Sequence, residues 1–297
     1  MKRIIFIVLV CLIILFSDLI IGAVSKGFIL KSPDVGVNQT NSVQALFHRK
    51  SDVLILGPST ANHHYDTRVI KDSLGMSVYN AGYDGQNIRY SAMVFYSYLK
   101  RCTPKLIILD VGSSVMNSSW NTNLSDMNCF YGISEPVDSI IEDLTSPIDK
   151  LKLKSNIYRY NNSWQWLLYA YSKKSQNDLD GYRPMPVNKE TNFKTIYVNR
   201  TSFKVDSINL KYLNGIVNTC HDKGIKLVIG LSPSLRVAKK SELREWLYTY
   251  CKANNVQLLD YYYDERFIKH AELYYDIDHL NSEGAIIYTK DFLSKIK

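Results

Sequence analysis

Three residues of this chain, Ser59, Asp276 and His279, have the side-chain types of a nucleophilic acyl-transfer site. A serine hydroxyl is a weak nucleophile that needs a positioned base, and the base needs a carboxylate to orient it. Asp276 and His279 are three residues apart in one loop, so they can converge on a serine from another part of the fold. We therefore predict Ser59 as the nucleophile, His279 as its base and Asp276 as the orienting residue. Asp278 is the alternative orienting residue, although a side chain next to His279 reaches the imidazole less easily.

Donors for a reacting carbonyl oxygen are also present near the predicted nucleophile. Ser59 follows a Gly-Pro turn and precedes a helical segment, whose first backbone N–H groups are free to bind an oxyanion. Gly82 or Gly85, after the next strand, can bring an unhindered N–H close to the same oxygen. Each feature alone is typical of a helix cap or a turn, and it is their combination that favours an active site. His63 and His64 follow Ser59 closely, and we expect them to face solvent, with a place in the lining of the site as the alternative.

The segments that carry these residues alternate between predicted strands and predicted helices. Short apolar runs predict strands at 52–57, 77–80, 105–111, 225–231 and 256–260. Helical spacing of apolar residues predicts helices at 60–74, 86–100, 206–223, 239–254 and 282–295. This alternation indicates a three-layer α/β/α fold with a central parallel sheet. Ligands bind at the carboxyl ends of the strands in such sheets, which is where Ser59 and Gly82 fall.

The stretch 113–204 interrupts this alternation. It is rich in Asn, Ser and aromatic residues, and it contains predicted helices near 136–144 and 147–174. We interpret it as a mainly helical insertion over the edge or mouth of the sheet. The helical spacing of its aromatic residues favours packing, and binding of a polymer is the alternative. These residues are Tyr158, Tyr160, Trp164 and Trp166.

The N-terminal segment predicts a membrane anchor. Ile4–Val24 is almost wholly apolar, follows Lys2 and Arg3, and is long enough to cross the hydrocarbon core, which takes about 20 residues. A cleaved signal peptide is the alternative, but the apolar run is long for one. Asp18 is costly at mid-bilayer and tolerable toward one end. The basic residues place the N-terminus in the cytoplasm and the remaining chain outside it. The predicted organisation is an anchor at 1–24, a juxtamembrane spacer at 25–50 and an α/β domain at 51–297.

Composition argues against several other classes of function. The net charge is +8, but the Lys and Arg residues are scattered, so no nucleic-acid-binding stripe is predicted. A basic surface of this kind suits anionic lipid or an anionic envelope polymer. The five cysteines form no CxxC pair and the six histidines no HExxH motif, so neither a metal nor a cofactor is predicted.

With these residues identified, the pattern resembles the SGNH, or GDSL-type, hydrolase superfamily. Gly57–Pro58–Ser59 is similar to the first sequence block of that superfamily, and Gly82 to the glycine of its second block. Asp276 and His279, as Asp-x-x-His before the last helix, are similar to its final block. The resemblance implies a flavodoxin-like sheet and an oxyanion hole that takes backbone N–H groups from Ser59 and Gly82.

The resemblance covers residues 52–112 and 225–295, and it fails at the third block. That block supplies an Asn side chain to the oxyanion hole in the superfamily, whereas this chain has Gly112–Ser113–Ser114. Ser114 is the nearest replacement. Loss of one oxyanion donor costs about 100-fold to 1,000-fold in rate. The chain is therefore either an enzyme in which Ser114 or another group replaces the Asn, or a weak or inactive relative.

An N-terminal anchor followed by this domain resembles the membrane-anchored branch of the superfamily. That branch includes proteins similar to alginate O-acetyltransferases and to the DltD protein of teichoic acid D-alanylation. The resemblance implies an acyl-ester hydrolase or O-acyltransferase, with O-acetyl as the expected group, acting on an envelope or exported polysaccharide. It also implies a membrane-bound acyl donor protein as a partner. The alternative is a catalytically inactive module that binds or assembles an envelope polymer.

Overall fold

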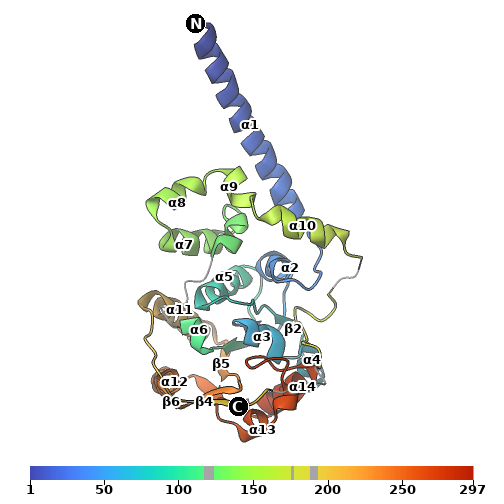
Figure 1. The fold of residues 1–297 in the computed structure, drawn as a ribbon, viewed down its shortest axis with the longest axis vertical. Helices are drawn as coiled ribbons and strands as arrows, with labels where there is room; N and C mark the ends of the chain where they lie inside the picture. Colours follow the sequence, from blue (N-terminus) through green and yellow to red (C-terminus); the bar gives the residue numbers. More distant parts are fainter. Residues whose placement is uncertain (117–123, 175–176, 188–192, 297) are drawn as a thin grey trace. The chain divides into compact units, whose positions relative to one another are not determined.

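The computed structural model describes residues 1–116, 124–174, 177–187 and 193–296 (Figure 1). The chain divides into two compact units, one formed by residues 1–47 and 123–176 and the other by residues 48–122 and 177–297. We call them the helical unit and the sheet unit. The predicted domain boundaries at 24 and 50 stay predictions. The predicted insertion at 113–204 lies partly outside the described residues.

The sheet unit contains a five-stranded sheet in which every pair of neighbours is parallel. The strand order is β2-β1-β3-β5-β7, which is the flavodoxin-like order of doubly wound folds. The strands are β1 Val53–Leu56, β2 Val78–Asn80, β3 Leu106–Asp110, β5 Lys226–Leu231 and β7 Gln257–Asp260. The predicted α/β fold with a central parallel sheet is confirmed. The chain reverses its direction of winding at β1, so the crevice at the carboxyl ends of β1 and β3 is where a ligand is expected.

Helices flank this sheet, and alternate strand residues supply the core beneath them. One core cluster joins Val53 and Ile55 of β1 to Ile70, Tyr288 and Phe292 on the helices that pack beside each other at this face. These helices are α3 Ser59–His64, α4 Thr67–Leu74 and α14 Ser282–Ser294. The other long helices of the unit are α5 Ile88–Leu99, α11 Ser207–Lys223 and α12 Glu242–Ala253, and the short ones are α6 Ser113–Met116, α13 Glu265–Ile268 and η3 Ala271–Leu273.

Two local features of the sheet unit differ from the sequence prediction. The helix predicted at 60–74 is two helices, because Asp66 caps a new helix by accepting a 2.9 Å bond from the Arg68 amide. A second, two-stranded parallel sheet of β4 Ile196–Thr201 and β6 Arg236–Ser241 was not predicted. Most of β4 is exposed, so its sequence lacks the apolar alternation that marks a half-buried strand.

The helical unit contains α1 Lys2–Leu30, which is long and apolar enough to cross a membrane by length and composition. A signal sequence meets the same criteria. The helix predicted at 136–144 is confirmed, and the one predicted at 147–174 is three consecutive helices. The remaining elements are α2 Asn38–Val43, η1 Gln44–His48, η2 Leu124–Phe130, α7 Glu135–Leu144, α8 Pro147–Lys152, α9 Asn156–Tyr160 and α10 Ser163–Ser172.

A buried carboxylate connects the elements of the sheet unit. Asp110, fully buried at the end of β3, accepts hydrogen bonds from Thr60 Oγ1 at 2.5 Å and Tyr65 Oη at 2.7 Å. Ser232 Oγ, just after β5, donates a third bond at 2.5 Å and lies 3.2 Å from the Tyr288 hydroxyl of α14. Burial raises the pKa of the Asp110 carboxyl, and the three hydroxyl donors oppose this rise.

We predict that Asp110→Ala lowers the melting temperature of the detergent-solubilised full chain by about 10 °C. A buried hydroxyl left without a partner costs about 1–3 kcal/mol, and 1 kcal/mol shifts the melting temperature by about 2–4 °C in a domain of this size. Asp110→Asn, which keeps one acceptor oxygen, is expected to cost less. The control is Asp72→Ala, at an exposed position of α4. Circular dichroism melts measure the effect, and equal melting of Asp110→Ala and the control would contradict it.

Candidate active site

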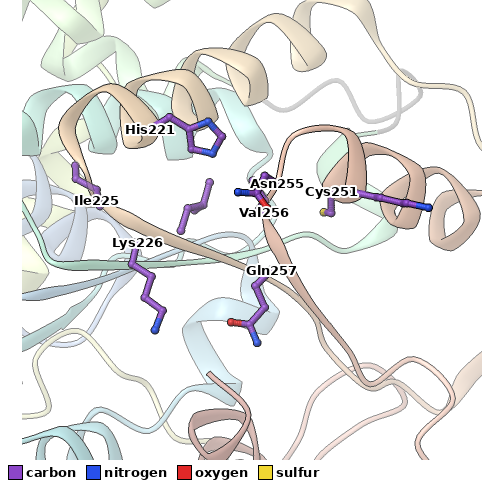
Figure 2. Close-up of a pocket in the computed structure, with 9 residues that line it drawn as sticks. His221, Ile225, Lys226, Cys251, Asn255, Val256 and Gln257 are labelled. Carbon is purple, nitrogen blue, oxygen red and sulfur yellow. The ribbon is translucent and has the colours of Figure 1, made fainter. Parts of the chain in front are cut away.

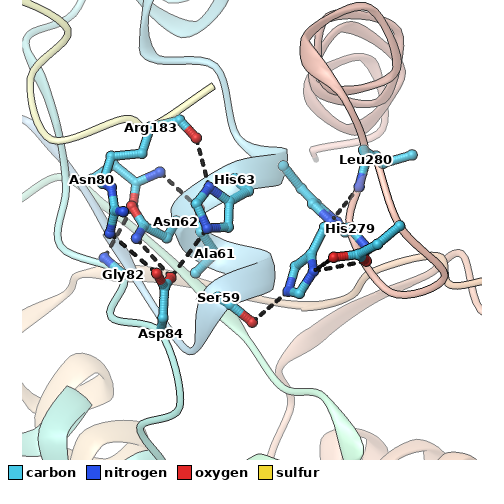
Figure 3. Close-up of polar contacts among 12 residues, drawn as sticks. Ser59, Ala61, Asn62, His63, Asn80, Gly82, Asp84, Arg183, His279 and Leu280 are labelled. Carbon is cyan, nitrogen blue, oxygen red and sulfur yellow. Dashed lines mark hydrogen bonds and ion pairs between the residues drawn. The ribbon is translucent and has the colours of Figure 1, made fainter. Parts of the chain in front are cut away.

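The structure brings Ser59, His279 and Asp276 into one hydrogen-bonded series (Figure 3). Ser59 Oγ lies 2.7 Å from His279 Nε2, and His279 Nδ1 lies 2.9 Å from both carboxylate oxygens of Asp276. An imidazole that donates from Nδ1 to the carboxylate leaves Nε2 free to accept the serine proton. This is the arrangement of a nucleophile, its base and the residue that orients the base.

The loop that carries His279 is held by the same carboxylate. Asp276 Oδ1 accepts hydrogen bonds of 2.8 Å from the backbone amides of Asp278 and His279, so the loop folds around this side chain. Partial burial raises the pKa of Asp276, but the bonds from the His279 ring and the two amides outweigh it and lower the pKa below its usual value. Asp278, the alternative orienting residue, accepts a 2.9 Å bond from Ser234 Oγ. The carboxylate that contacts the imidazole is therefore that of Asp276.

The turn before Ser59 requires a glycine. Gly57 has a φ of 144°, a value that residues with side chains rarely adopt. A Cβ atom at this position would lie 2.8 Å from both the Ala61 Cβ atom and the Asp110 carbonyl oxygen. The absence of a side chain therefore lets the chain turn sharply out of β1 and places Ser59 at the start of α3.

His64 connects the helix of Ser59 to the loop of His279. Its Nε2 atom accepts a 3.0 Å hydrogen bond from the Leu280 amide, so the ring proton lies on Nδ1. Burial lowers the pKa of His64 well below its usual value, with a further lowering from His279 and His63, and the ring is therefore neutral. The expectation that His63 and His64 face solvent is wrong, since both are buried. The reason is that α3 is short and packs against α14 and β3.

A second polar cluster lies beside the first on α3 (Figure 3). Asp84 lies 3.2 Å from His63 Nε2, accepts a 2.9 Å bond from Asn62 Nδ2, and accepts a 3.1 Å bond from Arg183 Nη1. Partial burial raises the pKa of Asp84, but the contacts with His63, Asn62 and Arg183 hold it well below its usual range. His63 Nδ1 lies 2.6 Å from the Arg183 carbonyl oxygen, so each ring nitrogen of His63 faces an oxygen atom. The His63 and His279 ring centroids are 5.5 Å apart.

The structure does not show the predicted oxyanion donors aimed at one point beside Ser59. The Gly82 amide donates a 3.0 Å bond to Asn80 Oδ1 inside its own turn. Gly82 also lies against α3, where a Cβ atom would be 2.4 Å from the Asn62 nitrogen, so this close approach requires a glycine. Ser114 belongs to α6, but its side chain lies outside the described part of the structure. The oxyanion roles of Ser59, Gly82 and Ser114 stay predictions.

A cavity of about 570 Å³ lies at the opposite end of the strands from Ser59 (Figure 2). It lies at the amino ends of β5 and β7 and includes His221, Lys226 and Cys251 in its lining. Parallel sheets bind ligands at their carboxyl ends, so this cavity is separate from the candidate site. Among the described residues, no group of three or more His, Cys, Asp or Glu side chains converges to hold a metal ion.

Comparisons with known proteins give a fold likeness only. No family model matches the chain, and no curated protein matches it. One similar solved structure is of a protein assigned to the G-D-S-L family of lipolytic proteins from Desulfitobacterium hafniense DCB-2, at 12% identity and a TM-score of 0.39, over 82% of this chain and 97% of that chain. Another is of a protein assigned as an acylhydrolase from Bacteroides fragilis, at 12% identity and a TM-score of 0.42, over 88% and 96%. Because both TM-scores are low, the functional interpretation rests on the side chains of this chain.

We predict that Asp84→Asn lowers the melting temperature at pH 7, and that this loss shrinks as the pH falls below about 4. The pKa of Asp84 is lower in the folded than in the unfolded protein. The carboxylate therefore stabilises the fold above its unfolded pKa of about 3.9, and this contribution is lost as the pH falls toward the folded pKa. Melting curves at a series of pH values measure this, with Asp72→Asn as the exposed control. A loss that is independent of pH would contradict the assigned charge.

Proposed function

We propose that this chain is a serine-dependent acyl-ester enzyme of the SGNH type. The proposal rests on the hydrogen-bonded series from Ser59 through His279 to Asp276. The sharp glycine turn before Ser59 and the flavodoxin-like strand order support it, because both place the hydroxyl at the carboxyl edge of the sheet.

In the proposed reaction, Ser59 Oγ bonds to the carbonyl carbon of an acyl ester while His279 Nε2 takes the hydroxyl proton. The ester C–O bond then breaks, and the imidazolium returns this proton to the leaving alcohol oxygen, so that an acyl-Ser59 ester remains. Asp276 holds the ring and stabilises its positive charge. Water or an acceptor hydroxyl next gives its proton to His279, takes the acyl group, and regenerates the Ser59 hydroxyl. Water makes the chain a hydrolase, and an acceptor hydroxyl makes it an O-acyltransferase.

The proposed oxyanion hole uses the amides of Ser59 and Gly82 together with the Ser114 hydroxyl. The Gly82 amide must share its proton between Asn80 Oδ1 and the oxyanion, or leave Asn80 during the reaction. A donor that is already engaged stabilises the oxyanion less than a free one. We therefore expect slower acylation than an oxyanion hole with three free donors would give.

The proposed setting is the cell envelope. In this proposal α1 anchors the chain with its N-terminus in the cytoplasm, because Lys2 and Arg3 precede its apolar run. The sheet unit is then outside the cytoplasm. The proposed substrate is an O-acyl, most simply O-acetyl, group on an envelope or exported polysaccharide. The proposed partner is a membrane-bound protein that supplies the acyl group.

A catalytically inactive binding module is the second candidate. Two observations favour it, namely the bond that already engages the Gly82 amide and the absence of an Asn in Gly112–Ser113–Ser114. In this case the same sheet edge would hold a polymer without reacting with it. Covalent labelling of Ser59 distinguishes the two candidates.

We predict that a fluorophosphonate labels the full chain at Ser59. The activated oxygen should attack phosphorus as it attacks an acyl carbon, so Ser59→Ala is expected to abolish labelling, and His279→Ala to slow it at least about 1,000-fold. Ser73→Ala, at an exposed position of α4, is the matched control and should label like the wild type. Gel fluorescence and peptide mass spectrometry measure the label. Labelling that persists in Ser59→Ala refutes the nucleophile, and a folded wild type without label favours the binding module.

We predict that Asp276→Asn and Asp278→Asn differ widely in activity. Asp276 contacts the imidazole, and its amide variant favours the wrong ring tautomer, so we expect kcat to fall about 10⁴-fold. Asp278 contacts Ser234 instead, so its variant should lower kcat far less than Asp276→Asn does. Hydrolysis of p-nitrophenyl acetate measures both rates, and far-ultraviolet circular dichroism checks the fold. Equal losses in the two variants would remove Asp276 from its assigned role.

A further inference from the structure

Asp18, the charged residue within the apolar run of α1, accepts hydrogen bonds from the start of α9. The Asp18 carboxylate accepts hydrogen bonds from Ser155 Oγ at 2.9 Å and from Asn156 Nδ2 at 2.8 Å. The backbone amides of Asn156 and Ile157 donate two more, at 3.1 and 2.9 Å. Asp18 therefore caps the start of α9, and four donors satisfy a charge that would otherwise be costly in an apolar environment.

One face of α1 packs against the same helices along its last three turns. Gly22, one turn after Asp18, leaves no room for a Cβ atom, which would lie 2.4 Å from the Asn156 side chain. Ser25 and Ile29 continue this face and are buried. The Phe28 ring centroid lies 5.4 Å from that of Tyr171, whose hydroxyl donates a 2.9 Å bond to the Phe28 carbonyl oxygen. The end of α1 is thus a structural member of the helical unit.

The helices α8, α9 and α10 expose large apolar side chains. Ile148 and Leu151 on α8 are 65% and 64% exposed, and Leu168 on α10 is 68% exposed. We call the exposed residues of these helices the apolar patch, and its members are Ile148, Leu151, Ile157, Tyr158, Leu168, Tyr169 and Tyr171. The same stretch, residues 147–174, is strongly basic, with six Lys and Arg residues against one Asp. Apolar, aromatic and basic side chains together are typical of helices that lie in the surface of an anionic membrane.

The expected depth of Asp18 in the bilayer agrees with helices α8, α9 and α10 lying in the membrane surface. Asp18 lies fourteen residues beyond Ile4, where the apolar run begins, which is about 21 Å along a helix. The hydrocarbon core is about 30 Å thick, so an upright helix that enters at Ile4 carries Asp18 about 9 Å below the far surface. Amphipathic helices in the membrane surface insert their apolar face about 5–10 Å deep. The start of α9 is bonded to Asp18, so an α1 that crosses the bilayer would hold the start of α9 at this depth.

We propose that α8, α9 and α10 lie in the surface of the bilayer that α1 crosses, with the apolar patch inserted among the lipids and Asp18 joining them to α1. The inference rests on α1 being a membrane segment and is independent of the Ser59 chemistry. The bilayer is the occupant of the patch because the patch and the exposed apolar residues of α1 belong to one unit, joined by the Asp18 bonds. In this proposal α1 is retained, since cleavage after it would remove Asp18 from α9.

The test places a fluorophore on the apolar patch of the full chain. Leu151→Cys and Leu168→Cys, each with Cys11 and Cys102 replaced by Ser, are labelled with an environment-sensitive nitrobenzoxadiazole group. The protein is then reconstituted into vesicles of three parts phosphatidylcholine to one part phosphatidylglycerol, with or without spin-labelled lipid. The matched control is Ile287→Cys, which is 47% exposed on α14 of the sheet unit. Near-ultraviolet circular dichroism checks that each variant is folded.

We expect the labels at 151 and 168 to be blue-shifted and to lose at least half of their emission to the spin-labelled lipid, while the label at 287 is unchanged. Labels at 151 and 168 that are as water-exposed as the one at 287 would overturn the proposal. Labels that are shielded from water but insensitive to the spin-labelled lipid would overturn it too, since a protein, such as a second copy of this chain, then covers the patch. The intact mass of the membrane-isolated protein should include residues 1–24, and loss of that segment contradicts the role of Asp18.

Discussion

The buried carboxylate of Asp110 is the constraint on which the geometry of the candidate site depends. Its oxygens accept hydrogen bonds from hydroxyl groups of two segments, namely Thr60 and Tyr65 at the two ends of α3, and Ser232 after β5. Thr60 follows Ser59 directly, so the bond to Asp110 fixes the first turn of α3 over the end of β3. Tyr65 and Ser232 also contact the Tyr288 hydroxyl, which extends the network to α14. A fully buried carboxyl group is tolerated at this position because all of these donors face it.

The positions of Ser59 and His279, the proposed nucleophile and base, then follow from two helices that pack around one core. Ser59 begins α3, and His279 lies three residues before Ser282, the first residue of α14. Asn281 caps α14 by accepting bonds of 3.1 and 3.0 Å from the amides of Glu283 and Gly284. His64 bonds the Leu280 amide, and Thr289 of α14 bonds the His64 carbonyl oxygen. The distance between Ser59 and His279 is therefore fixed by bonds on both sides of it. A preorganised pair of this kind needs no rearrangement before proton transfer.

The sequence contains enough information to predict the main sheet and the residues of the hydrogen-bonded series, because both are local patterns. The strands are short apolar runs, and the spacing of Asp276 and His279 within one loop is visible without a structure. The cluster around Asp84 is not predictable in this way, since His63 and Arg183 are 120 residues apart and Arg183 lies outside any motif. The sequence also does not indicate that His63 and His64 are buried, for a related reason. A six-residue helix shows no apolar periodicity that would reveal how it is enclosed.

The two candidate functions can be weighed by how much each departure from a complete site would lower the rate of an enzyme. Loss of one oxyanion donor slows catalysis about 100-fold to 1,000-fold, whereas loss of the nucleophile or its base slows it about 10⁶-fold. The engaged Gly82 amide and the absent Asn concern only the proposed oxyanion hole, so in the proposed enzyme they would weaken catalysis without removing it. The Ser59–His279–Asp276 series, on which most of the rate depends, is complete. The Ser59–His279 bond is one of several contacts that hold α3 and α14, since His64, Asn281 and Asp110 bond to the same segments. The complete series is therefore the reason that we propose a slow acyl-ester enzyme ahead of a binding module.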